Sequence, residues 1–498
     1  MGESAAIATG NRPPSGYAKY VGRVGGLAFA LGVGAAILIG AGAASANTGE
    51  SGAGDSGGAT SHSSPGPRTR EAPRTPPRAS ASSDNRQSIR ESRRLAHRDS
   101  LEGRRAARQA ANDSPTAAAR PTRPVQTVTI RTAVADPAST PAVSSLGSSG
   151  AKTTETPTAT ATAVDRTVVA SGLDGPVDFQ FLPDGRIVVA EKGGKIKIVE
   201  DGTVSRRPLV RLPVLTQGER GINGIAVDPD FATNGYLYVA YTTRTARDRL
   251  TRLTVVGDRV KFGSPKVLLE TTDRSELFHH GGALGFGPDG KLYWGVGDNK
   301  NGANAQDLST IHGKVIRINP DGSVPTDNPD LGPGALPVIY ASGFRNPFRL
   351  TFTPTGELLL TDVGENSFEE LNLVTAGGNY GWPNAEGNCA PCASIDPIYT
   401  YAHNGGGAAI TSVLFYDGGL LGAAYQDKVF ITDEVQGWMK VLTCSADFSS
   451  CGDVQDFDPA AGTSVVLRQA PDGSIYQLTY APGQLVRIAG ASPAAALV

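Results

Sequence analysis

Short runs in which apolar side chains alternate with small or polar ones recur from about residue 165 to the C-terminus. Alternation with a period of two is typical of a β-strand with one buried face. Each run follows a turn containing Pro, Asp or Gly, and such turns supply the backbone angles that tight hairpins need. The six runs are PDGRIVVAE from Pro183, DPDFATNGYLYVAYT from Asp228, PDGKLYWGVGD from Pro288, PTGELLLTDVG from Pro354, QDKVFITDE from Gln426 and PDGSIYQLTY from Pro471.

These runs form a repeat whose strands begin 46 to 71 residues apart. Each unit has room for about four short strands, which is the size of one propeller blade. The repeat therefore predicts an all-β fold, a six-bladed β-propeller, because a solenoid would show a shorter and more constant period. The run from Arg166 to Ala170 precedes the first unit, and we expect it to pair with the C-terminal strands and close the ring.

The N-terminal third of the chain has a different composition. It is dominated by Ala, Ser, Thr, Pro, Gly and Arg, and it has no aromatic residue between Phe29 and Phe179. Such a segment cannot bury enough apolar surface to offset the entropy of ordering it. We therefore predict a disordered linker over residues 47–164 and the propeller over residues 165–498.

Residues 24–46 form a run without charged side chains, preceded by Lys19 and Arg23. The run ends in Ala44-Ser45-Ala46, so the N-terminus has the three parts of a signal peptide. It is also long enough to span a bilayer if it is not cleaved. We predict a signal peptide over residues 1–46, with membrane anchoring through residues 24–46 as the alternative. In both cases the propeller is secreted or lies in the cell envelope.

The charge divides along the same boundary. Residues 1–165 contain 19 Lys and Arg against 12 Asp and Glu (net +7), whereas the rest contains 27 against 36 (net −9). An acidic folded part argues against a nucleic-acid partner. The basic linker is typical of a solvated tether, although contact with anionic envelope polymers or lipid headgroups stays open.

The four cysteines form two local pairs, Cys389 with Cys392 and Cys444 with Cys451. In an exported protein, an even number of closely spaced cysteines favours disulfides. A redox or metal-binding role for the first pair is the alternative. Zinc is disfavoured because the chain has no second C-x-x-C motif.

Three segments contain candidate catalytic or metal-binding groups. His279 precedes a predicted strand and Asp298 follows it, so the carboxylate is placed to orient the imidazole as a general base. The alternative is that His279 only caps the hairpin. Arg345 lies in a loop, where a guanidinium can stabilise charge on a reacting oxygen or simply pair with a carboxylate. Residues 362–370 are rich in oxygen ligands that suit Ca²⁺, although solvated acidic loops are common.

Several long segments resemble the glucose/sorbosone dehydrogenase family, which comprises soluble sugar dehydrogenases that use pyrroloquinoline quinone (PQQ) and calcium. The resemblance covers roughly residues 171–488, and the family fold is a six-bladed propeller. Its motifs are GERGINGIAVDPDF from Gly218, HHGGALGFGPDGKLYWGVGDN from His279, HGKVIRINPDGSVPTDNP from His312, YASGFRNPFRLTFTPTGELLLTDVG from Tyr340 and EELNLVTAGGNYGWPN from Glu369.

The resemblance implies roles for individual residues. The base that takes the sugar hydroxyl proton falls on His279, and its carboxylate partner falls on Asp298. The quinone carbonyls would be contacted by Arg345 and Asn346. The backbone carbonyls that hold calcium would be those of residues 364–365, Gly364 and Glu365.

The chain departs from the family pattern at five positions. Glu219 replaces a Gln beside the cofactor, and Phe278 replaces the Asp before the catalytic His. The Lys and two Arg that bind the carboxylates of PQQ align with Val435, Thr463 and Val465. Because PQQ is a tricarboxylate, burying it without cationic partners is costly.

These observations predict an exported oxidoreductase that transfers a hydride from a sugar or polyol carbon to PQQ with calcium assistance. His279 would act as the base, while Arg345 and Ca²⁺ would stabilise the developing charge. The electron acceptor beyond the quinone is not specified by the sequence. Two alternatives stay open, a non-catalytic propeller that binds glycan or protein and a calcium-dependent sugar lactonase.

Overall fold

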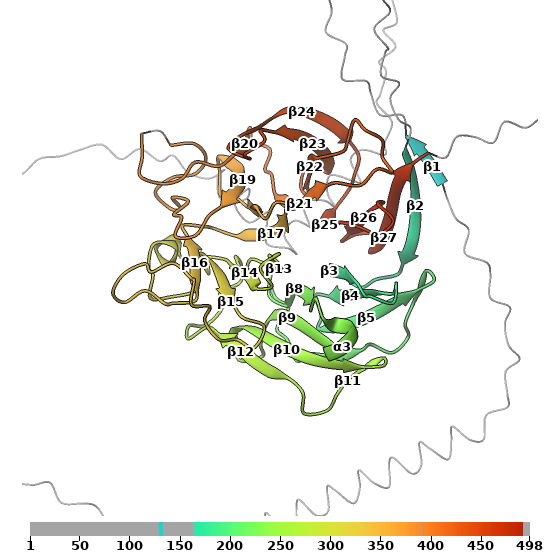
Figure 1. The fold of residues 1–498 in the computed structure, drawn as a ribbon, viewed down its shortest axis with the longest axis horizontal. Helices are drawn as coiled ribbons and strands as arrows, with labels where there is room; N and C mark the ends of the chain where they lie inside the picture. The colour runs from blue at the N-terminus through green and yellow to red at the C-terminus, as the bar shows by residue number, and fades with distance from the viewer. Residues whose placement is uncertain (1–128, 133–163, 390, 492–498) are drawn as a thin grey trace, which may run out of the picture. The chain divides into compact units, whose positions relative to one another are not determined.

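The computed structural model describes residues 129–132, 164–389 and 391–491. The strands in these residues form six antiparallel sheets around a central axis (Figure 1). The predicted six-bladed β-propeller is therefore confirmed. We number the sheets as blades 1 to 6 in the order of their innermost strands.

In blades 1 to 3, strands that are consecutive in the chain pair as hairpins, with two exceptions. Blade 1 contains β3 (Pro176–Phe181), β4 (Ile187–Glu191), β5 (Lys195–Glu200), β6 (Thr203–Val204) and β7 (Val210–Arg211). Blade 2 contains β8 (Ile222–Val227), α3 (Phe231–Asn234), β9 (Tyr236–Thr242), β10 (Asp248–Val256), β11 (Arg259–Val260) and β12 (Lys266–Glu270). Blade 3 contains β13 (Leu284–Phe286), β14 (Leu292–Val296), the 3-10 helix η1 (Gly302–Ala305), β15 (Lys314–Ile318) and β16 (Ile339–Ser342). The exceptions are β7, which pairs with β5, and β12, which pairs with β10.

Blades 4 and 5 follow the same plan, whereas blade 6 combines both ends of the folded part. Blade 4 contains β17 (Pro347–Phe352), β18 (Leu358–Asp362), β19 (Phe368–Val374) and β20 (Tyr399–Ala402). Blade 5 contains β21 (Ile410–Tyr416), β22 (Lys428–Asp433), β23 (Trp438–Cys444) and β24 (Cys451–Asp458). Blade 6 contains β25 (Ser464–Gln469), β26 (Ile475–Thr479), β27 (Gln484–Gly490), β2 (Val164–Ser171) and β1 (Thr129–Thr132).

The ring closes in blade 6, where β2 pairs antiparallel with β27 and places Thr167 opposite Arg487. This confirms the closing role predicted for the run from Arg166 to Ala170. Strand β1 then pairs with the outer edge of β2. Because β1 lies in the segment expected to be linker, the sheet reaches further towards the N-terminus than the predicted boundary. An edge strand such as β2 presents backbone N–H and C=O groups, and β1 pairs with these groups.

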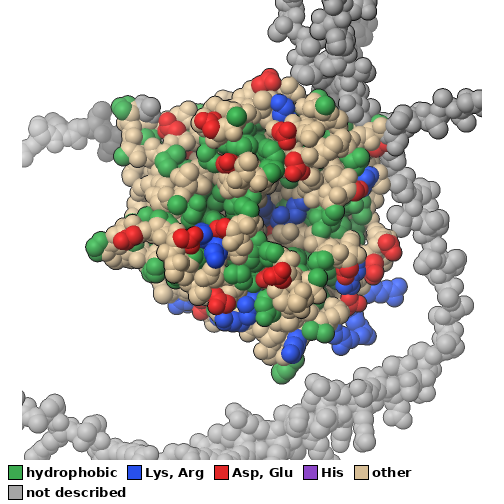
Figure 2. Space-filling view, viewed as in Figure 1, with side chains coloured by type: hydrophobic (Ala, Val, Ile, Leu, Met, Phe, Trp, Pro, Cys, Tyr) green, Lys and Arg blue, Asp and Glu red, His purple; other side chains and the backbone are tan. Residues whose placement is uncertain are grey.

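The core consists of apolar layers between neighbouring blades. Between blades 1 and 2, for example, Ile196 of β5 and Ile225 of β8 are fully buried in one cluster. Burial of this kind is the main stabilising contribution to a propeller, since its blades are separate sheets. At the axis, Arg349 of β17 donates hydrogen bonds to the carbonyl oxygens of Val177 in blade 1 and Phe348. Basic side chains are visible in the central hollow (Figure 2).

None of the helices among the described residues is long and apolar enough to cross a membrane. The predicted signal peptide or anchor, including residues 24–46, lies outside the described residues.

Candidate active site

A histidine and an aspartate meet on the face of the ring where β13 begins and β14 ends, which we call the site face. His279 precedes β13 and Asp298 follows β14, and these strands are antiparallel. The start of one strand therefore lies beside the end of the other. The Nδ1 atom of His279 is 2.7 Å from Oδ1 of Asp298, and both side chains are buried.

Asp298 is held by two further donors. The indole Nε1–H of Trp382 binds its Oδ2 (2.8 Å), and the backbone N–H of Lys300 binds its Oδ1 (2.8 Å). Burial opposes ionisation of Asp298, but the hydrogen bonds from His279 and Trp382 outweigh it and hold the pKa below its usual value. Asp298 is therefore an anion that accepts the Nδ1–H of His279.

His279 is neutral at physiological pH. Burial, helped by the nearby Arg345 guanidinium, lowers the pKa of His279 to about 4. Because Nδ1–H is directed at Asp298, the unprotonated ring nitrogen is Nε2. The backbone of His279 has a φ of 65°. This conformation is uncommon for residues other than Gly, and such strain often marks functional sites.

Arg345 and Asn346 lie between β16 and β17 and are fixed by Asp362 at the end of β18. The carboxylate of Asp362 accepts the backbone N–H groups of Arg345 (2.9 Å) and Asn346 (2.6 Å). The guanidinium of Arg345 donates to the Val363 carbonyl (2.9 Å) and lies 5.6 Å from the ring centre of Trp382. The short FRNP motif is thus anchored on blade 4 with its cation beside the histidine–aspartate pair.

Glu219 precedes the first strand of blade 2, and its side chain is hydrogen-bonded to the backbone that leads into blade 3. Its Oε2 accepts the backbone N–H groups of His279 (2.7 Å) and His280 (3.3 Å), and its Oε1 lies 3.5 Å from Nδ2 of Asn346. Burial raises the pKa of Glu219. The side chain of His280 pairs with Asp248 instead of the site (3.0 Å). Glu219 thus supports the backbone conformation of His279.

A cavity of about 490 Å³ opens beside these groups. That volume is in the range of small-molecule sites. It is lined by His279, Asp298, Lys300, Gly302, Ala303, Glu365, Trp382, Pro383, Asn384, Ala385 and Glu386. The histidine–aspartate pair therefore faces a space in which a sugar-sized ligand fits.

The predicted calcium-binding residues, Gly364 and Glu365, lie in the loop between β18 and β19 and are half-buried. Within the described part of the chain, neither of their carbonyl oxygens accepts a hydrogen bond. The carboxylate of Glu365 also lines the cavity, 3.9 Å from Arg345. Free carbonyl and carboxylate oxygens are the donor set that Ca²⁺ prefers, so this loop fits calcium.

The corresponding strand ends of blades 5 and 6 do not fit a tricarboxylate. Val435 packs against the apolar cluster of blades 4 and 5, and Val465 is buried in the core of blade 6. The hydroxyl of Thr463 is hydrogen-bonded to both backbone groups of Ala481 (2.9 and 2.8 Å). These three positions therefore offer neither a positive charge nor a free hydrogen-bond donor.

An acidic side chain increases this mismatch. Glu434 is buried, and neither of its carboxylate oxygens has a hydrogen-bond partner among the described residues. Burial and the adjacent Asp433 raise the pKa of Glu434 to about 8. Val435, Thr463, Val465 and Glu434 thus offer no cation to the carboxylates of a bound cofactor.

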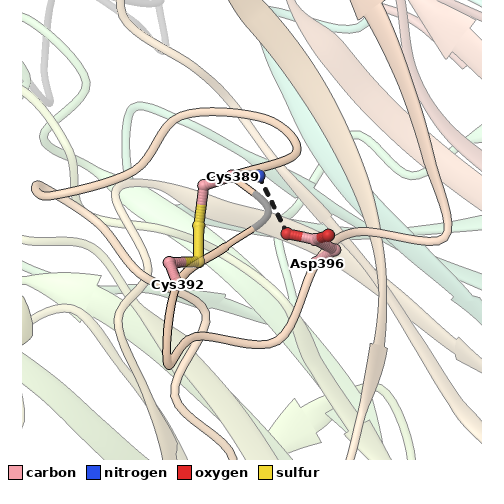
Figure 3. A group of neighbouring side chains, drawn as sticks. All are labelled: Cys389, Cys392 and Asp396. Atoms are coloured by element: carbon pink, nitrogen blue, oxygen red, sulfur yellow. Dashed lines mark hydrogen bonds between the residues drawn. A yellow bond between two sulfur atoms is a disulfide. The ribbon is translucent and has the colours of Figure 1, made fainter.

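Both cysteine pairs form disulfides, Cys389–Cys392 and Cys444–Cys451, as predicted. Asp396 lies beside the first pair, and its Oδ1 accepts the backbone N–H of Cys389 (3.0 Å; Figure 3). Since both thiols are consumed in the S–S bond, this group is a structural clamp on the loop and not a metal site.

Sequence reasoning missed the roles of Trp382, Asp362 and Glu386. The sequence pattern places Asp362 only among several possible oxygen ligands, and it assigns no role to Trp382 or Glu386. Trp382 is 84 residues from Asp298 in the chain, and no local pattern indicates that contact. In the sequence, the segment GGNYGWPNAEG is rich in Gly and aromatic residues, which indicates a long ordered loop there.

Comparison with known proteins agrees with the fold. The model of the Glucose / Sorbosone dehydrogenase family matches residues 173–487. Quinoprotein glucose dehydrogenase B of Acinetobacter calcoaceticus is 33% identical over 270 residues, which are 48% of this chain and 55% of that protein. Aldose sugar dehydrogenase YliI of Escherichia coli is 27% identical over 356 residues, 64% of this chain and 91% of that protein.

A solved structure gives the same result. The PQQ-bound aldose sugar dehydrogenase of Streptomyces coelicolor superposes with a TM-score of 0.57 at 25% identity, covering 66% of this chain and 98% of that one. The chain spans about half the length of the Acinetobacter relative and nearly all of the Streptomyces one. The family match covers well over half of the chain and confirms the resemblance seen in the sequence. The chain belongs to the Glucose / Sorbosone dehydrogenase family, a family of oxidoreductases.

Proposed function

We propose that this protein is a sugar or polyol oxidoreductase in which His279 takes the proton of the reacting hydroxyl group. The observation that carries the proposal is the chain of hydrogen bonds from Trp382 to Asp298 to His279 beside a cavity of about 490 Å³. A neutral imidazole whose other nitrogen is bound to a carboxylate is the arrangement a general base requires.

Each residue of the site has a distinct part in this proposal. Asp298 fixes the tautomer of His279 and stabilises the imidazolium that forms when Nε2 accepts the proton. Arg345 places a positive charge close to the site, where it favours negative charge on a reacting oxygen. Glu219 holds the backbone of His279 through two N–H groups, and Asn346 in turn accepts the N–H of Gly281 (2.9 Å).

The hydride acceptor expected from family membership is PQQ, a quinone that takes up the hydride when bound. Arg345 and Asn346 are suitable for contacts to its carbonyl oxygens. The carboxylate end is different, because Val435, Thr463 and Val465 offer no cation there. We therefore expect PQQ to bind weakly, with its carbonyl end as the main point of contact.

Calcium is part of the proposal because the carbonyl oxygens of Gly364 and Glu365 are free to coordinate it. The two disulfides suit an oxidising, extracytoplasmic location. A signal peptide over residues 1–46 is consistent with that location and stays a prediction.

A second function, a non-catalytic propeller that binds a glycan or protein, is favoured by one observation. Glu434 is buried and has no hydrogen-bond partner among the described residues, and it adjoins Val435, which the resemblance aligns with a residue that binds the cofactor carboxylates. A protein that no longer needed PQQ would tolerate such a change. In that case the histidine–aspartate pair would contribute only to structure and ligand contacts.

Titration of the purified protein with PQQ and Ca²⁺ separates these functions. The proposed enzyme should reduce an artificial dye acceptor in the presence of at least one aldose or polyol from a panel. Binding should be followed independently by PQQ fluorescence or calorimetry. Absence of both PQQ binding and dye reduction, with calcium binding retained, would reject the oxidoreductase in favour of the binding propeller.

A further inference from the structure

One carboxylate organises the whole loop that carries the candidate calcium ligands. Glu386 lies in the long connection between β19 and β20, four residues after Trp382. Its Oε1 accepts the backbone N–H groups of four consecutive residues, at 2.7 Å (365), 3.0 Å (366), 3.0 Å (367) and 3.3 Å (368).

Successive N–H groups that converge on one oxygen form an anion-binding nest. Burial opposes ionisation of Glu386, but these four hydrogen bonds hold its pKa below the usual value. The carboxylate of Glu386 therefore occupies this nest. Its hydrogen bonds to the four N–H groups are charge-assisted, and such bonds are stronger than those to a neutral acceptor.

The loop around Glu386 is tightly closed. A Cβ atom placed on Gly364 would lie 1.8 Å from the carbonyl oxygen of Phe368 and 2.8 Å from Oε1 of Glu386. Only glycine fits there. The N–H groups of residues 365–368 are bound to Glu386, and among the described residues no donor binds the carbonyl oxygens of Gly364 and Glu365.

The geometry points to Glu386 as the positioning residue of the cation site, which holds the loop of residues 364–368 in the shape that frees these two carbonyl oxygens. This inference rests on the calcium site of the proposed function. Glu386 also lines the cavity together with Glu365, so its negative charge favours a cation nearby. The opposing charges are Arg345 and Lys300, whose Nζ lies 4.0 Å from Glu365.

The test compares the full-length protein with Glu386→Gln and Glu386→Ala by calorimetric titration with Ca²⁺ and by hydrogen exchange of the loop amides. Glutamine keeps an acceptor oxygen without the charge, and alanine removes it. We expect Ca²⁺ affinity to fall roughly tenfold in Glu386→Gln and further in Glu386→Ala, since charge-assisted hydrogen bonds are lost. Exchange protection of amides 365–368 should fall in the same order.

Asp396→Asn is the matched control, because Asp396 accepts a single backbone N–H in the neighbouring disulfide loop. It should leave both Ca²⁺ affinity and protection of residues 365–368 unchanged. Unchanged Ca²⁺ affinity and protection in both Glu386 variants would overturn the inference while leaving the calcium site intact. A wild-type protein that binds no Ca²⁺ would overturn the calcium site itself and the positioning role with it.

Discussion

The two halves of the site face have opposite chemistry. On blades 3 and 4, the polar side chains of the candidate site are hydrogen-bonded, as in the Asp298 carboxylate that binds His279 and Trp382. On blades 5 and 6, the equivalent strand ends carry Val435 and Val465 in apolar packing, and Glu434, which has no hydrogen-bond partner among the described residues. The groups that the proposed function assigns to proton transfer lie on blades 3 and 4, whereas Val435, Thr463 and Val465 offer no cation to a polyanion.

In the proposed function, proton transfer and cofactor retention depend on different parts of the site face. The first depends on a short-range network within two blades. The second depends on isolated cations on the opposite blades, which can be lost without disturbing that network. Variants on either half can therefore be assayed separately.

The largest effect is expected from His279→Ala. Removing a positioned general base lowers turnover by about 10²–10⁴-fold. Cofactor and calcium affinity should largely survive, since the proposed contacts are made by Arg345, Asn346 and the loop of residues 364–368. Steady-state dye reduction and a separate binding titration measure the two effects. The control is His280→Ala, whose side chain pairs with Asp248 outside the site.

The pH profile gives an independent check on His279. A base works only when unprotonated, and the folded-state pKa of His279 is lowered to about 4. Turnover of the wild type should therefore rise as pH increases through about 4 and stay level to neutral pH. A profile limited by a group with a pKa near 7, or full activity in His279→Ala, would remove this residue from the mechanism.

The opposite half of the site face is tested by Glu434→Gln. The folded-state pKa of Glu434 is raised to about 8 from a usual 4.5, so the folded protein binds this proton more tightly than the unfolded chain. Its ionisation therefore costs stability as pH rises from about 4.5 to 8. At pH 9 the variant should be more stable by on the order of a few kcal/mol, and near pH 4 the difference should vanish.

Denaturant unfolding of wild type and variant at several pH values measures this effect. At pH 9, where Glu434 is ionised, the same variant should also bind PQQ more tightly than the wild type, because one buried negative charge beside Val435 is removed. Equal stability of the two proteins at every pH would mean that another group offsets the cost of burying the Glu434 charge. The two halves of the site face would then not differ in how their polar groups are partnered.

A smaller effect is expected from Trp382→Phe. Phenylalanine keeps an aromatic ring near Arg345 but removes the N–H that binds Oδ2 of Asp298. Loss of one hydrogen bond to a charged group should lower turnover roughly tenfold. The matched control is Trp438→Phe, since Trp438 donates to Gln436 on blade 5 (2.8 Å). Equal losses in both variants would show a packing effect and not a role of Trp382 in orienting Asp298.

The fold was predictable because its signal is local and repeated. Each blade has one turn followed by an alternating strand, and the closing role of residues 166–170 followed from their position before the first repeat. The meeting of His279 and Asp298 was predictable for the same reason, since both flank one hairpin. Trp382 and Glu386 were not, because they lie in an irregular loop whose contacts depend on tertiary packing. Strand β1 was missed because its four residues stand in a polar, low-complexity context.

The smallest effects are expected from the disulfides, and they also distinguish the two halves. Loops closed by three and seven residues restrict the unfolded chain little, so each disulfide should contribute about 2 kcal/mol to stability. Paired serine variants of Cys444 and Cys451, on blade 5, should melt at a lower temperature but keep full turnover. Paired serine variants of Cys389 and Cys392 should show a similar loss of stability together with reduced turnover, because that loop follows directly on the cavity residues Trp382 and Glu386. Thermal melts and dye reduction on the same samples measure both. If removing the blade 5 disulfide reduced turnover as much, the two halves of the site face would be coupled through the ring and could not be treated as separate.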